Sequence, residues 1–419
     1  MELLRKAENL TEAYRILDPS KPLTGKELER FYAQRPDEAS IAPLWDKLEA
    51  DDSGDDKTLF TGHRGNGKTT ELEWLAVKLR STHIVVSFNA ETQFNLGDVD
   101  YRDLLVLLGL QVYNEAKTNW NLKLSQDKLH DLLFWYGVHI FEEDEKRRWE
   151  SEADAELNAG FARFNLKLKT EPRQRVRYRS EAESHLSDLL ERLNAVLDEM
   201  KSKTDRRIMV IVDGLEKMYT MTQVLDLFCR GANALMEPHC RAVYTVPLSL
   251  YHTPDVQQVL LSFTRDFSLP NIKSANRDKT PCPEGRDALL RVLDNRLRPG
   301  LISEDAASLL VEMCGGLLKQ LISLAGESVA HARRLRGERG SVLPQDVQYA
   351  ATKLRNVYRA NLTEAYYGEL LRIYRGGAFV NSPVTQDLLH NLSLLEYDGG
   401  DAWWAVNPIV KKLLDEQSS

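Results

Sequence analysis

The fold depends on one stretch of sequence, Gly62-His63-Arg64-Gly65-Asn66-Gly67-Lys68-Thr69. It has the pattern glycine, four residues, then Gly-Lys-Ser/Thr, which is typical of a phosphate-binding P-loop. Residues 58–60 predict a short buried strand before it, and residues 70–76 predict a helix after it. Strand, loop and helix are the context in which this pattern binds phosphates, and the alternative is a glycine-rich turn with an incidental lysine.

The residue types of the P-loop suit a nucleoside triphosphate. Glycines let the backbone turn its N–H groups toward phosphate oxygens, and the following helix adds its positive N-terminal end. Lys68 is expected to reach the β- and γ-phosphates and Thr69 to coordinate Mg²⁺, so ATP and Mg²⁺ are the expected cofactors. His63 is interpreted as a solvent-facing residue that could touch the γ-phosphate. The expected nucleotide contacts in and next to the loop are Gly62, His63, Arg64, Gly65, Asn66, Gly67, Lys68, Thr69 and Thr70.

Length and composition bound the class of protein. With 419 residues and a net charge of -8, the chain is expected to form two or three domains without a surface that is basic throughout. The longest apolar runs, such as 104–110, are far shorter than a membrane span, and residues 1–6 lack the apolar stretch of a signal peptide. A cytoplasmic protein without membrane contact is therefore expected. Four scattered cysteines without C-x-x-C spacing predict neither a zinc site nor a disulfide framework.

The apolar pattern predicts an α/β chain with helices at both ends. Strand, helix and strand within about thirty residues form a βαβ unit, which predicts a parallel sheet. Besides 58–60, buried strands are predicted at 83–88, 208–213 and 241–245, and helices within 1–50 and 284–355 and at 101–108 and 186–200. The strand 208–212 consists of five apolar residues and ends in Asp213. An acid at the carboxyl end of a central parallel strand lies where open α/β sheets hold ligands, so Asp213 is predicted to support Mg²⁺ together with Thr69.

The P-loop and the run Asp213-Gly214-Leu215-Glu216 together resemble P-loop ATPases of the AAA+ and STAND groups, especially the origin-recognition-like branch with a C-terminal winged helix. The resemblance implies an α/β P-loop NTPase sheet with a helical insertion, followed by an all-α lid and a winged-helix domain. The implied ranges are an N-terminal helical segment at 1–50, an ATPase core at 51–280 with its insertion at about 115–205, a lid at 281–355 and a winged-helix-like domain at 356–419.

The resemblance also implies roles for residues outside the P-loop. Family members often have a second acid directly after the Mg²⁺ aspartate, where this chain has Gly214. Glu216 is then the implied residue for positioning water, the alternatives being a salt bridge or a helix N-cap. Thr245 lies where the family keeps a γ-phosphate sensor, and Lys319 takes the place of the lid arginine after Gly315-Gly316. Slow hydrolysis, or use of ATP as a switch, is expected.

Several arginines are candidates for contacts between molecules. Arg265 and Arg296 lie near places from which such ATPases reach a neighbour's nucleotide, and the alternative for both is a structural role. Arg173, Arg175, Arg177 and Arg179 alternate within the basic stretch 163–179, which on a strand would place them on one face. They are read as a solvated edge strand, as a contact with nucleic-acid phosphates, or as arginines donated to a neighbouring subunit.

The C-terminal part predicts helices at 366–374 and 384–394 and a hairpin of 395–397 and 402–406 around Asp398-Gly399-Gly400-Asp401. This order resembles a winged helix. Residues 361–419 hold eight acids against four bases, which disfavours contact with DNA phosphates. The acidic balance favours contact with a protein or an autoinhibitory role, with Trp403 and Trp404 as anchors or as core residues.

Three functions follow from these patterns and from what the resemblance to AAA+ and STAND ATPases implies. The first is an ATP-dependent switch that forms a homo-oligomer and controls an effector or regulatory protein, as in prokaryotic anti-phage defence or signalling modules. The second is a DNA-binding AAA+ ATPase of the replication or transposition loader type, in which the arginine stretch contacts DNA. The third is a scaffold that binds nucleotide without turnover.

Overall fold

The chain is described here from a computed structural model, which covers residues 4–50, 54–118, 124–125, 127–128, 131–132, 134–135, 179–180, 183–397 and 402–417. It consists of two compact units. Unit 1 comprises Met1–Asp46, Gly62–Leu75 and Ser268–Ser419, and unit 2 comprises Lys47–Thr61 and Ala76–Phe267. The P-loop therefore belongs to unit 1, whereas the strand that precedes it belongs to unit 2.

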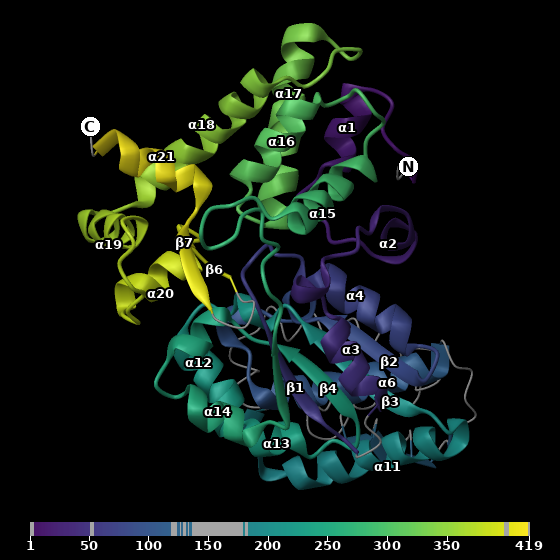
Figure 1. Ribbon diagram of the computed structural model, residues 1–419. Helices are drawn as coiled ribbons and strands as arrows, with labels where there is room; N and C mark the ends of the chain where they lie inside the picture. Colours follow the sequence, from purple (N-terminus) through teal and green to yellow (C-terminus); the bar gives the residue numbers. More distant parts are fainter. Residues whose placement is uncertain are drawn as a thin grey trace, which may run out of the picture. The chain divides into compact units, whose positions relative to one another are not determined.

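A five-stranded sheet forms the centre of unit 2 (Figure 1). Its strands follow the order β2-β3-β4-β1-β5, and β2, β3, β4 and β1 run parallel to one another. Their bounds are β1 (Lys57–Thr61), β2 (His83–Asn89), β3 (Arg207–Asp213), β4 (Arg241–Thr245) and β5 (Arg265–Ser268). Every residue of β1 and β4 is buried, as expected of central strands in a parallel sheet. The predicted α/β class is confirmed, while β5 was not predicted.

The strand register brings several polar residues to one edge of the sheet. Phe60 of β1 pairs with Thr245 of β4, and Asn89 of β2 pairs with Asp213 of β3. Because the strands are parallel, the end of β1 at Thr61 lies at the same carboxyl edge as these side chains. The P-loop begins at the residue that follows Thr61.

Helices cover the sheet of unit 2. The long helix α11 buries Leu189, Leu193, Val196 and Met200 at steps of three and four residues, which confirms the predicted amphipathic helix. It packs against β3 and α6, and α6 packs against β2. The helices of this unit are α5 (Ala90–Gln93), α6 (Tyr101–Thr118), α11 (Leu186–Thr204), α12 (Met221–Leu225), α13 (Ala232–Met236) and α14 (Val256–Ser262). Two further helices cross the boundary between the units, α3 (Ala42–Ala50) and α4 (Lys68–Leu79).

Unit 1 contains the predicted helical lid and the C-terminal hairpin. Helix α17 packs against α1, α16 and α18 around a shared apolar core, and α18 packs in turn against α21. The elements are α1 (Leu10–Ile16), α2 (Gly25–Phe31), α15 (Pro283–Asp294), α16 (Glu304–Met313), α17 (Leu318–Arg336), α18 (Pro344–Asn361), α19 (Glu364–Tyr374), α20 (Pro383–His390), β6 (Leu394–Tyr397), β7 (Trp403–Val406) and α21 (Pro408–Gln417). Helix α20 ends before the predicted Leu394, because Leu392 takes a positive φ of 64° and turns the chain into β6.

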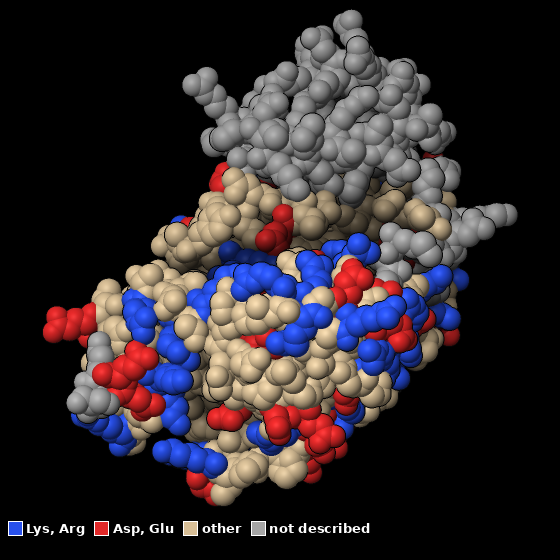
Figure 2. Space-filling view, turned by 90° about the horizontal axis from the view of Figure 1, so that it is seen from above, with Lys and Arg blue, Asp and Glu red and all other residues tan. Residues whose placement is uncertain are grey.

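Two properties of the surface bear on function. Among the described residues no helix is long and apolar enough to cross a membrane. Figure 2 shows basic and acidic side chains interspersed on the face seen from above. The net charge of -8 is thus compatible with local groups of cations.

Candidate nucleotide-binding site

The backbone of the P-loop requires its glycines. Gly62, Gly65 and Gly67 have φ angles of 147°, 79° and 98°, a region that residues with a β-carbon rarely adopt. A β-carbon at Gly65 would lie 2.8 Å from Cβ of Lys319, and one at Gly67 would lie 2.7 Å from Cδ1 of Leu318. Only a chain without side chains at these positions can form this cradle, so the loop fits the phosphates that the motif predicts.

Lys68 and Thr69 open helix α4 directly after the cradle. The buried ammonium group of Lys68 donates hydrogen bonds to the carbonyl oxygens of Gly62, at 2.8 Å, and of His63, at 2.9 Å. The lysine is therefore curled over the loop, as expected of a group that contacts phosphates bound there. Thr70 accepts a hydrogen bond from the N–H of Leu23 at 3.4 Å, which ties the start of α4 to the N-terminal segment.

Arg35 also holds the loop, although no motif in the sequence predicted this role. Its buried guanidinium donates from Nη1 to the carbonyl oxygen of Asn66 at 2.6 Å and from Nη2 to the carbonyl oxygen of Pro270. Asn66 in turn donates from Nδ2 to the carbonyl oxygen of Leu269 at 2.9 Å. The N-terminal segment, the P-loop and residues 269–270 are thus joined through main-chain carbonyl groups.

A buried carboxylate balances the charge of Arg35. Glu71 lies in the first turn of α4, and burial raises the pKa of its carboxyl group while the nearby Arg35 charge opposes that shift. Burial likewise lowers the pKa of Arg35. The hydroxyl of Tyr32 donates to Glu71 at 3.2 Å, and the Tyr32 ring stacks on Trp74 with centroids 6.1 Å apart. The helix that follows the loop is fixed to the N-terminal segment by this cluster.

The lid contacts the P-loop through its main chain. The N–H of Lys319, at the start of α17, donates to the carbonyl oxygen of Gly65 at 2.8 Å, while the Lys319 side chain is exposed. The preceding turn needs glycine, since Gly316 has a φ of 76° and a β-carbon there would lie 1.9 Å from the carbonyl oxygen of Ile272. The structure therefore brings Lys319 to the loop as predicted, and a role of its side chain toward nucleotide stays a prediction.

The interpretation of His63 as a solvent-facing residue is wrong. Its side chain is 4% exposed, and its Nε2 accepts a hydrogen bond from the N–H of Glu396 in β6 at 2.7 Å. The carbonyl oxygen of Glu396 accepts a bond from Nδ2 of Asn271 at 2.9 Å. The sequence could not reveal this contact, because any main-chain N–H can be the donor. The P-loop is consequently linked to the C-terminal hairpin as well as to the lid.

The carboxyl edge of the sheet in unit 2 holds Asp213. Its Oδ2 accepts a hydrogen bond from Nδ2 of Asn89 at 3.2 Å, across the neighbouring strands β3 and β2. Gly214 follows with a φ of 88°, and a β-carbon there would lie 2.7 Å from Oδ1 of Asn89. A side chain at position 214 would therefore be strained and would lie close to Asn89, which gives a steric reason for a glycine, and not a second acid, after Asp213.

Thr245 and Glu216 lie next to this turn. The hydroxyl of Thr245 accepts a hydrogen bond from the N–H of Leu215 at 3.0 Å and donates to the carbonyl oxygen of Val212 at 3.3 Å. It orders the turn, and its predicted role as a phosphate sensor stays a prediction. Glu216 is buried, and Oε2 has no hydrogen-bond partner within the part of the chain that the structure describes. No ion pair of Glu216 occurs there either, so the salt-bridge alternative gains no support.

The two single arginines have structural contacts. Arg265 donates to Oδ2 of Asp56 at 2.9 Å. Arg296 is buried and donates to the carbonyl oxygens of Val292, at 2.8 Å, and Phe31, at 3.3 Å, and burial lowers its pKa to about 10. These contacts favour the structural alternative for both residues.

The basic stretch is described only at its end. Arg173, Arg175 and Arg177 lie outside the described residues. Arg179 is in a helical turn and forms ion pairs with Asp98, at 2.8 Å, and Asp103, at 2.5 Å. The expectation of an extended strand with an outward-facing arginine is therefore wrong at Arg179.

No family model and no curated protein matches this sequence. A similar solved structure is Cdc6p from Pyrobaculum aerophilum, with 12% identity and a TM-score of 0.43; the match covers 96% of this chain and 98% of that one. A second is a Walker-type ATPase of Pyrococcus abyssi, with 15% identity and a TM-score of 0.47, covering 96% of this chain and 99% of that one. A third is the Orc1 protein of Aeropyrum pernix in complex with DNA, with 13% identity and a TM-score of 0.45, covering 100% of this chain and 98% of that one. At these identities the activities and partners of those proteins are not transferred to this chain. The sheet order, the glycine loop after β1 and the acid that ends β3 show an α/β P-loop NTPase fold with a helical lid.

Proposed function

We propose that this chain binds ATP with Mg²⁺ and acts as a slowly hydrolysing switch that controls a partner protein. The observation that carries the proposal is the double attachment of the P-loop. Gly65 accepts a hydrogen bond from the lid at Lys319, and His63 accepts one from the hairpin at Glu396. Phosphates that engage the loop backbone must act on both contacts, because the same short segment makes them.

The residues of the proposed ATP site have distinct tasks. The loop N–H groups and Lys68 bind the phosphates, and Lys68 exchanges its two bonds to loop carbonyls for bonds to phosphate oxygens. Mg²⁺ would be held by Thr69 and Asp213 and would neutralise charge on the β- and γ-phosphates. Asn89 keeps the Asp213 carboxylate oriented.

Hydrolysis is proposed to be slow, because the position directly after Asp213 is a glycine that the turn requires. Glu216 is the remaining carboxylate that can position water, and the lack of a hydrogen-bond partner for its Oε2 among the described residues supports that role. A slow step after binding is what a switch needs, since the bound state must outlast its contact with the partner.

Assembly and partner choice remain part of the proposal. We propose a homo-oligomer that forms with ATP and acts on an effector or regulatory protein, while a setting in anti-phage defence is an expectation from the resemblance alone. The DNA-loading alternative depends on the basic stretch 163–179. The one arginine of that stretch that the structure describes, Arg179, forms ion pairs with Asp98 and Asp103. No contact among the described residues favours the DNA-loading function over the switch.

The test measures ATP binding, turnover and native mass of the wild type, Lys68→Ala and Glu216→Gln. Lys78→Ala, on the exposed last turn of the same helix, is the matched control. We expect Lys68→Ala to lose at least about tenfold in affinity and Glu216→Gln to bind ATP with turnover reduced about a hundredfold. We also expect the mass of the wild type to rise with ATP and Mg²⁺. ATP binding that survives Lys68→Ala unchanged would refute the proposed site. ATP binding by the wild type without any turnover would refute the hydrolysis and support a scaffold that binds nucleotide.

A further inference from the structure

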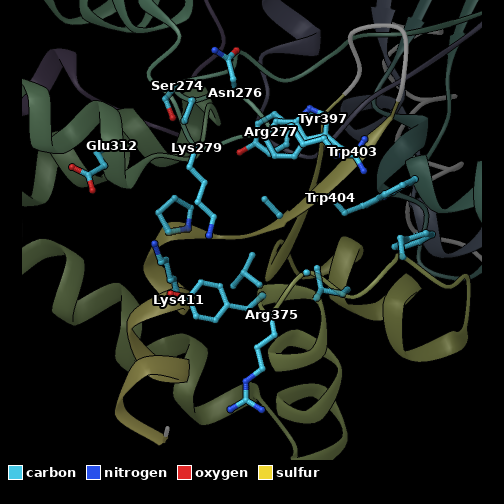
Figure 3. Close-up of a pocket in the computed structure, with 18 of the residues that line it drawn as sticks. Ser274, Asn276, Arg277, Lys279, Glu312, Arg375, Tyr397, Trp403, Trp404 and Lys411 are labelled. Carbon is cyan, nitrogen blue, oxygen red and sulfur yellow. The ribbon is translucent and has the colours of Figure 1, made fainter. Parts of the chain in front are cut away.

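A cavity of about 1350 Å³ lies beside the C-terminal hairpin, and all its lining residues belong to unit 1. Its walls are the loop 274–281, the segment 373–379 at the end of α19, strand β7 and the exposed side of α21. Figure 3 shows Lys279 extending from its loop toward the helix that carries Lys411, with Trp403 and Trp404 projecting from β7. The volume exceeds that of ordinary small-ligand pockets, so the cavity suits a segment of chain.

The outer edge of β7 faces this cavity. Within the described residues β7 pairs with β6 alone, and its residues 402–406 all line the cavity. The N–H of Asn407 donates to the carbonyl oxygen of Ser393 at 2.9 Å, which fixes the alternation of the antiparallel ladder. It follows that the main-chain N–H and C=O groups of Trp404 and Val406 point away from β6, toward the outer edge.

The two edges of the hairpin differ. At the outer edge of β6, the N–H of Glu396 donates to His63 and its C=O accepts from Asn271. At the outer edge of β7, no main-chain hydrogen bond of Trp404 or Val406 to another segment occurs among the described residues. A strand edge with unused donors and acceptors is a template for an added strand.

Cations surround this edge. Six basic residues line the cavity against two acids, and within the described residues none of the six forms an ion pair. The basic residues are Arg277, Lys279, Arg286, Arg375, Lys411 and Lys412, and the acids are Glu312 and Asp415. Three of the four bases of residues 361–419 are in this group, so the acidic total of that region conceals a local positive potential.

The loop that carries two of the cations is ordered in advance. The N–H of Asn276 donates to the carbonyl oxygen of Thr280 at 2.8 Å, and the N–H of Lys279 donates to that of Asn276 at 2.9 Å. The exposed side chains of Arg277 and Lys279 therefore project from a fixed turn. Because the loop backbone is ordered before binding, less conformational entropy is lost when a partner binds.

We propose that β7 binds an extended acidic segment of a partner protein as a third strand. Main-chain bonds to Trp404 and Val406 would give affinity, and the surrounding cations would select acidic side chains. A second copy of this chain does not fit, because pairing two β7 edges would bring both groups of cations together. A nucleic acid is not favoured, since one face of Trp403 is covered by Tyr397, with centroids 4.4 Å apart, and one face of Trp404 by Phe379, at 4.1 Å. The inference rests on the proposed control of a partner, but the surface contains no residue of the ATP site.

The probe is a fluorescein-labelled peptide of about eight residues that alternates Glu and Val, a length that one short strand can pair. Binding is measured by fluorescence anisotropy with the full chain at low salt. We expect Lys279→Glu/Lys411→Glu to weaken binding at least about tenfold, and Lys26→Glu/Lys47→Glu, at exposed lysines outside the cavity, to leave it unchanged. We expect the amide protons of Trp404 and Val406 to gain protection from exchange in the complex, which a purely electrostatic contact would not produce.

Two further probes separate the other occupants. The same peptide N-methylated at alternate residues is prepared in both registers, and we expect one register to lose binding, because its N–H groups are those that face β7. Equal binding to the charge-reversed protein, or binding without protection of Trp404 and Val406, would overturn the inference. An oligothymidine that binds the cavity in preference to the peptide would replace it with a nucleic-acid site. All measurements are repeated with Lys68→Ala without ATP, so that failure of the ATP site and failure of this surface give different results.

Discussion

The P-loop and the carboxyl edge of the sheet are held in opposite ways. Around the loop, Arg35, Lys319 and the β6 hairpin reach the same short segment from distant parts of the chain, mostly through main-chain groups. At the edge of the sheet, Asp213 is held by Asn89 and by the turn that Thr245 orders, all on neighbouring strands. The difference teaches that substitutions around the loop should change stability and nucleotide binding together, whereas substitutions at the edge should change chemistry with little change in stability.

Arg35→Met gives the largest effect on this comparison. It removes the donor of two loop-region carbonyl groups and the positive charge beside the buried Glu71, so we expect the free energy of unfolding to fall by about 3 kcal/mol. The matched change at the sheet edge is Asp213→Asn, which keeps shape and should alter stability by less than about 1 kcal/mol while Mg²⁺-dependent ATP binding falls. Urea unfolding measures both. Equal losses for the two variants would remove the distinction between the regions.

Gly65→Ala tests the contact between loop and lid at a second point. Both the positive φ of 79° and the nearby Cβ of Lys319 at 2.8 Å oppose a side chain, so we expect a loss of about 2 kcal/mol together with weaker ATP binding. Gly300→Ala is the control, because Gly300 has a similar φ of 85° but its nearest neighbour would be 3.9 Å away. We expect about 1 kcal/mol there, from the backbone alone. Thermal unfolding measures the stability of both variants. An equal loss of stability in Gly65→Ala and Gly300→Ala would show that contact with Lys319 adds nothing to the cost of a side chain at position 65.

The sequence predicted the parts of the site whose chemistry depends on residue type. The glycines and lysine of the P-loop and the acid after an apolar strand are such parts, and the strands at Lys57–Thr61 and Arg207–Asp213 agree with their predicted places. Lys319 was named from the resemblance of its turn to a lid turn, and its role toward nucleotide stays a prediction. The structure explains the two glycines before it, which the turn requires.

The contacts that hold the loop could not be predicted, because their acceptors and donors are main-chain groups. Arg35 binds carbonyl oxygens of Asn66 and Pro270, and any residues at these positions would offer the same oxygens. The donor to His63 is likewise a main-chain N–H. The summed charge of residues 361–419 also concealed the basic surface near β7, because the cations there come from segments that are separated in the sequence.

His63→Leu is expected to have a moderate effect. It removes the acceptor for the N–H of Glu396, and a buried donor left without a partner costs about 1 kcal/mol. We also expect ATP affinity to change, because a contact that phosphates act on must in turn affect their binding. Faster amide exchange at Glu396 with an unchanged ATP affinity would contradict the proposed coupling of the hairpin to the loop through His63. Arg64→Ala, at the exposed next residue, is the control and should leave that exchange rate unchanged.

The smallest effect concerns pH and the opposite, amino edge of the sheet. His83 begins β2 there, and burial, together with the charge of Arg241 at the start of β4, lowers its pKa below the ordinary value of 6.5. Because the folded-state pKa is lower than that of the unfolded chain, the neutral His83 contributes stability above about pH 6.5, and this contribution is lost as the pH falls through the folded-state pKa. Unfolding measured from pH 8 to 5 should therefore show a fall in stability that His83→Gln flattens, since glutamine does not titrate. ATP binding by the two proteins should keep the same ratio across this range, because His83 and Asp213 are at opposite edges of one sheet; a ratio that changes with pH would show that the carboxyl edge depends on the packing at the amino edge.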